Sequence, residues 1–215
     1  MVCRRCPRLV GFRENVVPRA AYQRDRYWRK PVPGFGDPDA ELVVVGLAPA
    51  AQGGNRTGRV FTGDNSGRFL VRALHKAGFA NQPVSESRDD GLVYSNCYVT
   101  AAVKCAPPGD RPSRSEFDRC GAYLDAELVL LKRAKVILAL GSLAMRAVVE
   151  SERRRGHATP GLEFAHGARY RITGGRLLVA SYHPSPRNTN TGKLTENMLT
   201  GLLLWIKDSL EKTRR

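Results

Sequence analysis

Residues 42–46 read Leu-Val-Val-Val-Gly, a short and continuous apolar run that is rich in β-branched side chains. A run of this kind is typical of a strand that is buried on both faces of a parallel sheet. A polar, glycine-rich segment follows, and residues 66–78 then place apolar side chains at helical spacing. The stretch therefore predicts a strand, a long loop and a helix, which together are the first unit of an α/β fold.

The same alternation continues to the end of the chain. Further strands are predicted at 93–103, 136–140 and 177–180. Further helices are predicted from the capping box of Ser113 and Glu116 to about 132, from 141–142 onward, and over 195–210. This order implies a mainly parallel sheet with helices on both faces. The working crevice of such a sheet lies at the carboxyl ends of the strands, where the loops 47–63, 105–114 and 182–193 begin.

The length and composition fit one folded domain. The chain has 215 residues, of which 42% are hydrophobic, and this excludes a disordered basic tail. We expect a single domain over 1–215, in which the proline-rich residues 1–40 form an irregular N-terminal arm. No apolar run approaches the ~20 residues of a membrane span, and the first residues lack the apolar core of a signal peptide. The sequence predicts a cytoplasmic protein with no membrane association.

Positive charge is concentrated in two segments. The chain has a formal net charge of +15, and residues 1–36 and 146–193 carry +7 and +6 of it. Residues 37–145, in contrast, carry a net charge of only +1. A charge excess of this size on a folded domain favours a polyanionic partner, most often nucleic acid, over a generally basic surface.

The cysteines suggest a thiolate centre. Cys3 and Cys6 form a C-x-x-C pair on the arm, and Cys105 and Cys120 bracket the exit of the second predicted strand and the helix after it. A site built from these four thiolates would anchor the arm, and both zinc and a [4Fe–4S] cluster accept such a ligand set. Unligated buried cysteines are the alternative. Cys97 lies inside the second predicted strand and is expected to be a core residue.

Three side chains in the loops could carry chemistry. Phe61 is an aromatic residue in a polar, glycine-rich loop, where it can stack on a planar ring or plug the core. Asp64 follows just before a helix, so a capping role is the simpler alternative to a catalytic one. His183 stands between a strand end and two prolines, a setting that holds it rigidly, and a buried, hydrogen-bonded histidine is the simpler alternative to a catalytic one.

Three motifs together resemble a known family. They are Gly-Leu-Ala-Pro-Ala-Ala-Gln-Gly-Gly-Asn-Arg-Thr-Gly-Arg-Val-Phe-Thr-Gly-Asp at 46–64, Val-Lys-Cys-Ala-Pro-Pro-Gly at 103–109, and His-Pro-Ser-Pro-Arg-Asn at 183–188. They look like those of the type-5 uracil-DNA glycosylases, an iron–sulfur branch of the uracil-DNA glycosylase superfamily. The resemblance covers nearly the whole chain, and the first motif is its most specific part.

The resemblance implies a three-layer α/β/α sandwich around a four-stranded parallel sheet. It also implies an enzyme that hydrolyses the N-glycosidic bond of uracil in DNA, after the nucleotide has been flipped out of the stack, and leaves an abasic site. The four cysteines would hold a [4Fe–4S] cluster with a structural role. We expect a monomer that acts on DNA in the prokaryotic nucleoid.

The resemblance also assigns roles to single residues. Phe61 would stack on the flipped base, and His183 would hydrogen-bond a base carbonyl and stabilise negative charge as the base leaves. The remaining substrate contacts are expected from Ala48, Ala50, Ala51, Asn55, Arg187 and Asn188. In this set, the backbone near the alanines would line the pocket, and Arg187 and Asn188 would enter the minor groove or hold neighbouring phosphates.

Two departures from the wider superfamily refine these expectations. Other branches place an Asp, Asn or Glu in the first motif to position water, whereas residues 47–51 here carry none. Asp64 is therefore expected to orient water or to stabilise the oxocarbenium-like sugar. Ala101 stands where related branches carry an Asn that reads uracil, so activity on other deaminated bases, such as hypoxanthine, is expected. The alternative function is a non-catalytic, nucleic-acid-binding iron–sulfur or zinc module.

Overall fold

The computed structural model describes residues 2–157 and 161–213. Its sheet has the strand order β1-β3-β2-β4-β6-β5. The four central strands are all parallel and confirm the predicted sheet: β2 (Leu42–Gly46), β3 (Cys97–Ala101), β4 (Val136–Leu140) and β6 (Leu177–Ser181). The two outer strands, β1 (Phe35–Gly36) and β5 (Arg169–Arg171), are short, antiparallel and were not predicted.

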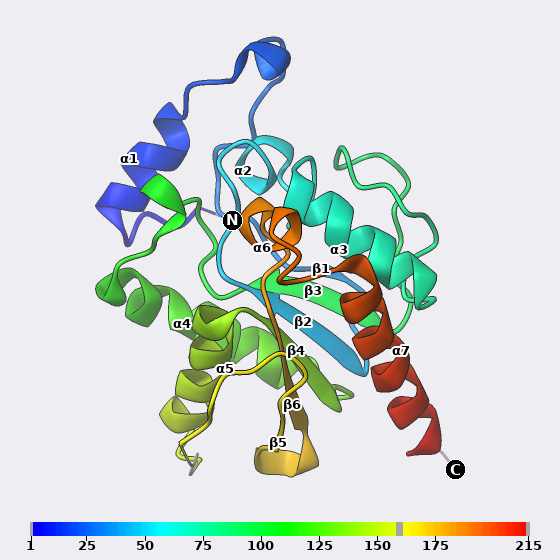
Figure 1. Cartoon of the computed structure of the whole chain (residues 1–215). Helices are drawn as coiled ribbons and strands as arrows, with labels where there is room; N and C mark the ends of the chain where they lie inside the picture. The colour runs from blue at the N-terminus through cyan, green and yellow to red at the C-terminus, as the bar shows by residue number, and fades with distance from the viewer. Residues whose placement is uncertain (1, 158–160, 214–215) are drawn as a thin grey trace.

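Helices cover both faces of the sheet, as expected (Figure 1). One layer contains α3 (Asn65–Lys76) and α7 (Glu196–Lys212), and the other contains α4 (Arg114–Leu130) and α5 (Ser142–Arg154). Alternate side chains of each strand enter the two cores: Val44 packs in the α3–α7 core and Val43 in the α4–α5 core. The three-layer sandwich follows from strands that are almost entirely apolar and therefore need both faces covered.

The predicted helix starts are found close to their expected positions. Asp64 caps α3, Thr195 caps α7, and Ser113 and Glu116 form the capping box of α4. The second strand begins later than predicted, at Cys97, because the residues before it pair with the segment that follows α3, through an isolated bridge from Tyr94 to Ala80.

The N-terminal arm is more regular than its prolines suggest. Residues Pro7–Asn15 form helix α1, and Ala20–Tyr22 form a 3₁₀ turn. The prediction of an irregular arm was wrong here, because Pro7 occupies the first turn of α1, where a missing N–H costs nothing. Leu9, Val10 and Arg13 are the buried side chains of this helix.

Three short elements complete the chain: the single helical turn α2 (Gly54–Thr57), a 3₁₀ turn at Pro108–Asp110 and α6 (Pro186–Asn190). A further 3₁₀ turn, Thr173–Gly175, connects β5 to β6. Within residues 2–157 and 161–213, no helix combines the length and the apolar character needed to cross a membrane.

Candidate active site and cysteine centre

A cleft of about 440 Å³ lies at the carboxyl ends of the parallel strands. The loops after β2, β3 and β6 all contribute to its wall, as the sequence predicts. Its lining includes six of the predicted site residues: Ala48, Ala50, Ala51, Phe61, Asp64 and His183. Ala101, at the end of β3, also reaches the cleft. The chain therefore brings residues from its first and last thirds to one surface.

Asp64 is both the N-cap of α3 and a residue of the cleft wall. Its Oδ1 accepts a hydrogen bond from the backbone N–H of Gly67 at 2.8 Å. Burial raises the pKa of the Asp64 carboxyl, and the backbone hydrogen bonds of Gly67 and Ser66 act in the opposite direction. The capping and catalytic interpretations of Asp64 are therefore compatible, because the carboxylate that caps α3 also lines the cleft.

Gly53 lies directly against the other oxygen of Asp64. A β-carbon added at Gly53 would overlap Oδ2 of Asp64. The position therefore needs a residue without a side chain, because Asp64 occupies the space that a β-carbon would need. The glycines of this loop thus allow the chain to close around the carboxylate.

His183 follows β6 and is held from its backbone. The side-chain Nδ2 of Asn188 donates a hydrogen bond to the carbonyl of His183 at 2.8 Å. Burial lowers the pKa of the His183 imidazole to about 4, so the ring is neutral near pH 7. A neutral imidazole donates from one ring nitrogen only, and it can do so to a carbonyl in the cleft without bringing a charge into it.

Phe61 lies next to His183, with the two ring centroids 6.1 Å apart. The backbone φ of Phe61 is +48°, a left-handed conformation that a bulky residue rarely adopts. Gly46 makes room for the ring, because a β-carbon at Gly46 would lie 2.6 Å from two Phe61 ring carbons. Strain of this kind persists where the surroundings hold it, and it often marks a functional residue.

The remaining predicted substrate contacts lie outside the cleft lining. Arg187 and Asn188 belong to α6, directly after the lining residues Ser185 and Pro186. Asn55 lies in α2, and none of its surface is exposed. The placement of Asn55 indicates a buried contact within the protein rather than a contact with substrate.

The arm contributes residues to the cleft that the sequence did not reveal. Arg19 and Tyr22 line the cleft together with Arg68 of α3. Arg56 stacks on the Tyr22 ring at 3.9 Å, and Arg68 pairs with Glu86. No local sequence pattern indicates that residues near 20 fold back over residues near 60. The sequence therefore could not predict that Arg19 and Tyr22 line the cleft.

The four predicted ligand cysteines line one small cavity between α1, α4 and the loop after β3. Cys105 and Cys120 are buried, whereas Cys3 and Cys6 are partly exposed. Among the residues that the structure describes, no group of three or more His, Cys, Asp or Glu side chains is arranged to hold a metal ion. Cys97 is fully buried in β3, away from this cavity, as expected of a core residue.

The surroundings of this cavity fit an anionic, sulfur-rich group. The guanidinium Nη1 of Arg13 lies 2.9 Å from Cys105 Sγ, and the backbone N–H of Lys104 donates to Cys120 Sγ at 3.2 Å. Arg13 is buried, and its Nε has no hydrogen-bond partner. A buried donor of this kind is costly unless an acceptor faces it. Four thiolates and a cation beside them suit a cluster of iron and sulfide.

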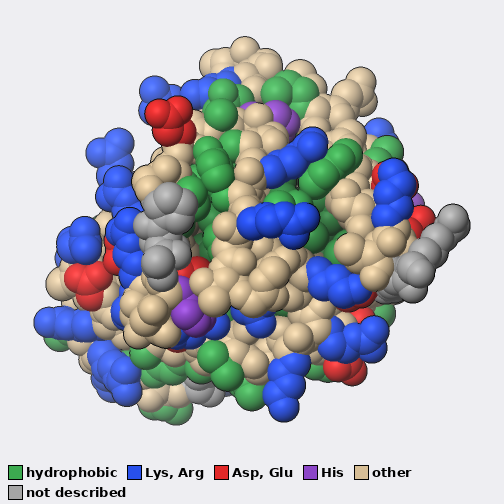
Figure 2. All heavy atoms as spheres, turned by 90° about the horizontal axis from the view of Figure 1, so that it is seen from below, with side chains coloured by type: hydrophobic (Ala, Val, Ile, Leu, Met, Phe, Trp, Pro, Cys, Tyr) green, Lys and Arg blue, Asp and Glu red, His purple; other side chains and the backbone are tan. Residues whose placement is uncertain are grey.

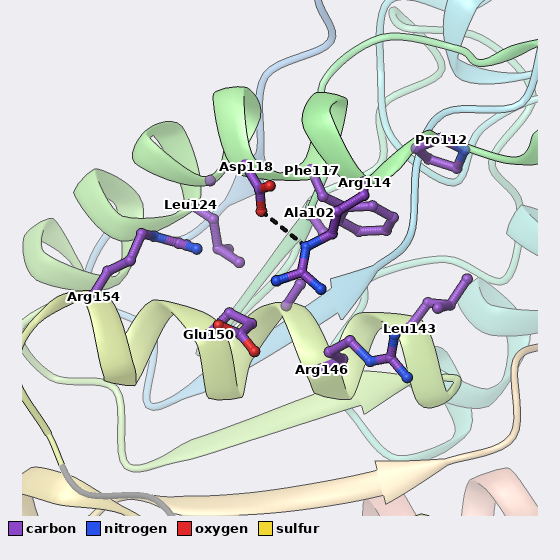
Figure 3. Close-up of a pocket in the computed structure, with 12 residues that line it drawn as sticks. Ala102, Pro112, Arg114, Phe117, Asp118, Leu124, Leu143, Arg146, Glu150 and Arg154 are labelled. Atoms are coloured by element: carbon purple, nitrogen blue, oxygen red, sulfur yellow. Dashed lines mark hydrogen bonds and ion pairs between the residues drawn. The ribbon is translucent and has the colours of Figure 1, made fainter.

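A second hollow, of about 180 Å³, lies between α4 and α5 (Figure 3). It contains none of the predicted site residues. Arg114 pairs with Asp118, four residues later in α4, and Arg154 of α5 pairs with Asp125 of α4. Two ion pairs within the protein thus border the hollow, which is also lined by Arg146 of α5.

Basic side chains are widely distributed on the surface. Figure 2 shows Lys and Arg spread over the face seen from below, where they are more abundant than Asp and Glu. Arg19, in the basic segment 1–36, lines the cleft, and Arg187, in the basic segment 146–193, lies in α6 beside it. Both charged segments thus reach the surroundings of the cleft.

Comparison with known proteins agrees with these features. The family model described as "Uracil DNA glycosylase superfamily" matches residues 33–207. A type-5 uracil-DNA glycosylase of Thermus thermophilus is 48% identical over 95% of this chain and 92% of its own length. One from Pyrobaculum aerophilum is 49% identical over 94% and 86%, respectively. A type-4 uracil-DNA glycosylase of Pyrobaculum aerophilum is 32% identical over 74% of each chain. The chain therefore belongs to the uracil-DNA glycosylase superfamily and, within it, to the type-5 family.

Proposed function

We propose that this protein is a DNA repair glycosylase that releases uracil from DNA and leaves an abasic site. The observation that carries the proposal is the convergence of Asp64, His183 and Phe61 on one cleft at the carboxyl edge of the sheet. The relatives named above carry the same activity in their names. The cleft volume of about 440 Å³ lies within the range of small-molecule sites, so a flipped-out base fits its scale.

In the proposed reaction, water adds to the anomeric carbon of the deoxyribose as the bond to the base nitrogen breaks. The bonding electrons leave with the base, and the sugar becomes oxocarbenium-like in the transition state. The water gives up one proton as it becomes the sugar hydroxyl, and the departing base anion takes up one from solvent to become the free base. The carboxylate of Asp64 would orient the water and stabilise the positive charge on the sugar. The neutral imidazole of His183 would donate to a carbonyl oxygen of the departing base, where negative charge develops.

The rest of the lining would hold the base. Phe61 would stack on its face, while backbone groups near Ala48, Ala50 and Ala51 would contact its edge. Arg187 and Asn188, in α6 at the rim, would hold the DNA backbone beside the flipped nucleotide. We assign no direct substrate contact to Asn55, because it is fully buried.

We also propose that the substrate range extends beyond uracil. Ala101 reaches the cleft with a methyl group, which cannot form the two hydrogen bonds that an amide would offer to uracil. A panel of duplexes that contain uracil or hypoxanthine, with wild type and Ala101→Asn, tests this. The variant should favour uracil over hypoxanthine more strongly than wild type does. Equal ratios in the two proteins would exclude Ala101 as the cause of a broad range.

For the cysteine cavity we propose a structural [4Fe–4S] cluster bound by Cys3, Cys6, Cys105 and Cys120. When bound, such a group would cross-link the arm to α4 and the loop after β3, and it takes no part in the hydrolysis. Iron and acid-labile sulfide assays, with the visible absorbance of the purified protein, test the proposal. A colourless protein that contains zinc would contradict it.

The decisive test of the function is base release from a uracil-containing duplex, without added metal or nucleotide. We expect free uracil and an abasic strand from the iron-loaded wild type. Asp64→Asn should bind the duplex with similar affinity and release uracil far more slowly. Tight binding by the wild type without any release would instead support the non-catalytic nucleic-acid-binding module.

A further inference from the structure

Arg13 contacts two parts of the molecule that are far apart in the sequence. Its guanidinium lies 2.9 Å from Cys105 Sγ through Nη1 and donates to the carbonyl of Cys3 through Nη2 at 3.0 Å. Its own backbone carbonyl accepts a hydrogen bond from Asn55 Nδ2 at 3.1 Å. One residue of α1 thus joins the cysteine cavity to the glycine-rich loop that forms one wall of the cleft.

Asn55 connects Arg13 to the wall of the cleft. The backbone N–H groups of Asn55 and Gly53 both donate to the carbonyl of Ala50, at 3.1 Å and 3.2 Å. Ala50 lines the cleft, and Gly53 lies against Oδ2 of Asp64. A shift of Asn55 would therefore move both the pocket wall and the support of the proposed catalytic carboxylate.

A second connection runs beside the first. Arg29 donates from its guanidinium to the backbone carbonyls of Glu14 and Val16, at the end of α1, and the bond to Val16 is 3.1 Å long. The backbone N–H of Arg29 donates to the carbonyl of Asn55 at 3.2 Å. The end of α1 and α2 are thus joined at two points, so that a movement of α1 is transmitted to Asn55 rather than absorbed by a loose loop.

The charge of Arg13 explains why this connection depends on the cysteine centre. The Arg13 side chain is 3% exposed, and its ion-pair partner, Glu14, lies at 3.5 Å and is 35% exposed. A buried cation is stable when an anion and hydrogen-bond acceptors face it. A centre built on thiolates supplies both, and Cys105 Sγ already lies 2.9 Å from Nη1 of Arg13. Without that centre, the most favourable position for the guanidinium is closer to solvent, and α1 would shift with it.

We propose that Arg13 is a positioning residue that couples occupancy of the four-cysteine centre to the shape of the cleft, through Asn55. This inference rests on the proposed glycosylase function, because it concerns the placement of Asp64 for that reaction. It gives the cysteine centre a specific effect on residues 46–66, beyond a general effect on folding. It also explains why a fully buried amide stands inside the first motif.

Hydrogen exchange with and without iron tests the coupling independently of activity. We expect that chelation of iron from the wild type speeds amide exchange in residues 46–66 and leaves the central strand β4 protected. Unchanged exchange in residues 46–66 would overturn the proposal. A loss of protection throughout the sheet would overturn it as well, since iron would then support the whole fold rather than this connection.

Two variants locate the coupling in the named residues. Asn55→Ala should keep its iron, show fast exchange in residues 46–66 while the iron is present, and lower the single-turnover rate by roughly 10- to 100-fold with little change in DNA affinity. Removing iron from this variant should then increase the exchange in residues 46–66 only slightly further, because the connection is already broken. Arg13→Gln should lose iron more readily than Arg13→Lys, which keeps the cation.

Asn15→Ala is the matched control, because Asn15 is exposed and bonds only within α1, to the carbonyl of Gly11. It should match the wild type in iron content, exchange and rate. If Asn55→Ala also matches the wild type in exchange and rate, the coupling is wrong. If no protein, including the iron-loaded wild type, releases uracil, the proposed function fails, and the exchange data still decide the coupling.

Discussion

Gly53 and Asp64 pack so closely that a side chain of any size at position 53 would displace the Asp64 carboxylate. Gly53 is the residue directly before α2, and Asp64 is the residue directly before α3. The position of the Asp64 carboxylate therefore depends on the lack of a side chain at Gly53. It depends also on the hydrogen bond from the backbone N–H of Gly67 to Asp64 Oδ1.

Gly53→Ala should lower the single-turnover rate of uracil release by roughly 10- to 100-fold, because a displacement of about 1 Å is enough to cause a loss of that size. Binding should change less than the rate. Gly201→Ala in α7 is the control, since nothing lies within 4 Å of a β-carbon there, and it should leave the rate unchanged. Equal rates for Gly53→Ala and the control would mean that Asp64 does not need this packing.

Two substitutions of Asp64 separate its cap from its chemistry. Asparagine is as good an N-cap as aspartate, so Asp64→Asn should have the same unfolding free energy as the wild type. Its single-turnover rate should nevertheless be lower by about 10²-fold or more. Asp64→Ala should lose the same activity and also about 1 kcal/mol of unfolding free energy. Urea unfolding and single-turnover kinetics provide the two measurements. An active Asp64→Asn would leave Asp64 with a structural role alone.

The lowered pKa of His183 predicts that the unfolding free energy depends on pH. Its pKa falls from an ordinary value of 6.5 to about 4 on folding. Between these values the unfolded chain binds more protons, so the unfolding free energy rises with pH and falls on acidification, by at most about 1.4 kcal/mol per pH unit. His183→Gln should lack this part of the slope. Urea unfolding from pH 7 to pH 4 checks the difference, and parallel curves for the two proteins would contradict it.

The buried ion pair of Lys104 and Glu127 should be sensitive to the loss of one partner. Lys104 Nζ contacts Glu127 Oε2 and Thr100 Oγ1, each at 2.6 Å, and the Lys104 side chain is 2% exposed. Glu127→Ala leaves that ammonium without its anion and should cost about 3 kcal/mol of unfolding free energy in the iron-loaded protein. The exposed pair of Lys212 and Asp208 provides the control, and Asp208→Ala should cost less than about 1 kcal/mol. Similar losses in both variants would show that the buried pair is solvated.

Most of the sheet and its helices could be predicted from the sequence, because the strands are largely apolar and several helices begin at recognisable caps. Residues 42–46 and 136–140 need both faces covered, and this requirement alone indicates a layered α/β fold. Edge strands of two or three residues carry no such pattern. Both β1 and β5 depend on the neighbouring strand that they join, so neither was predicted.

The site was predicted in part for a similar reason. Asp64, Phe61 and His183 stand in distinctive local motifs, and the cleft contains all three. Gly53 and Arg13 contact residues that are distant in the chain, and local sequence does not encode those partners. Asn55 was predicted as a substrate contact, but its contact with the backbone of Arg13 could not be read from the motif. The helix α1 was missed because its packing surface is the cysteine cavity, which exists only once the arm has folded back.

The two outer strands have a consequence for how copies of this protein meet. A parallel sheet that ended at β3 and β6 would present open rows of backbone N–H and carbonyl groups, to which another chain could add a strand. Here β1 covers one side and β5 the other, and both are too short to template further pairing. Arg169 and Arg171 of β5 add exposed positive charge at that outer edge, which repels a second copy. At high concentration, the two residues of β1 and the three residues of β5 thus protect the protein from edge-to-edge aggregation.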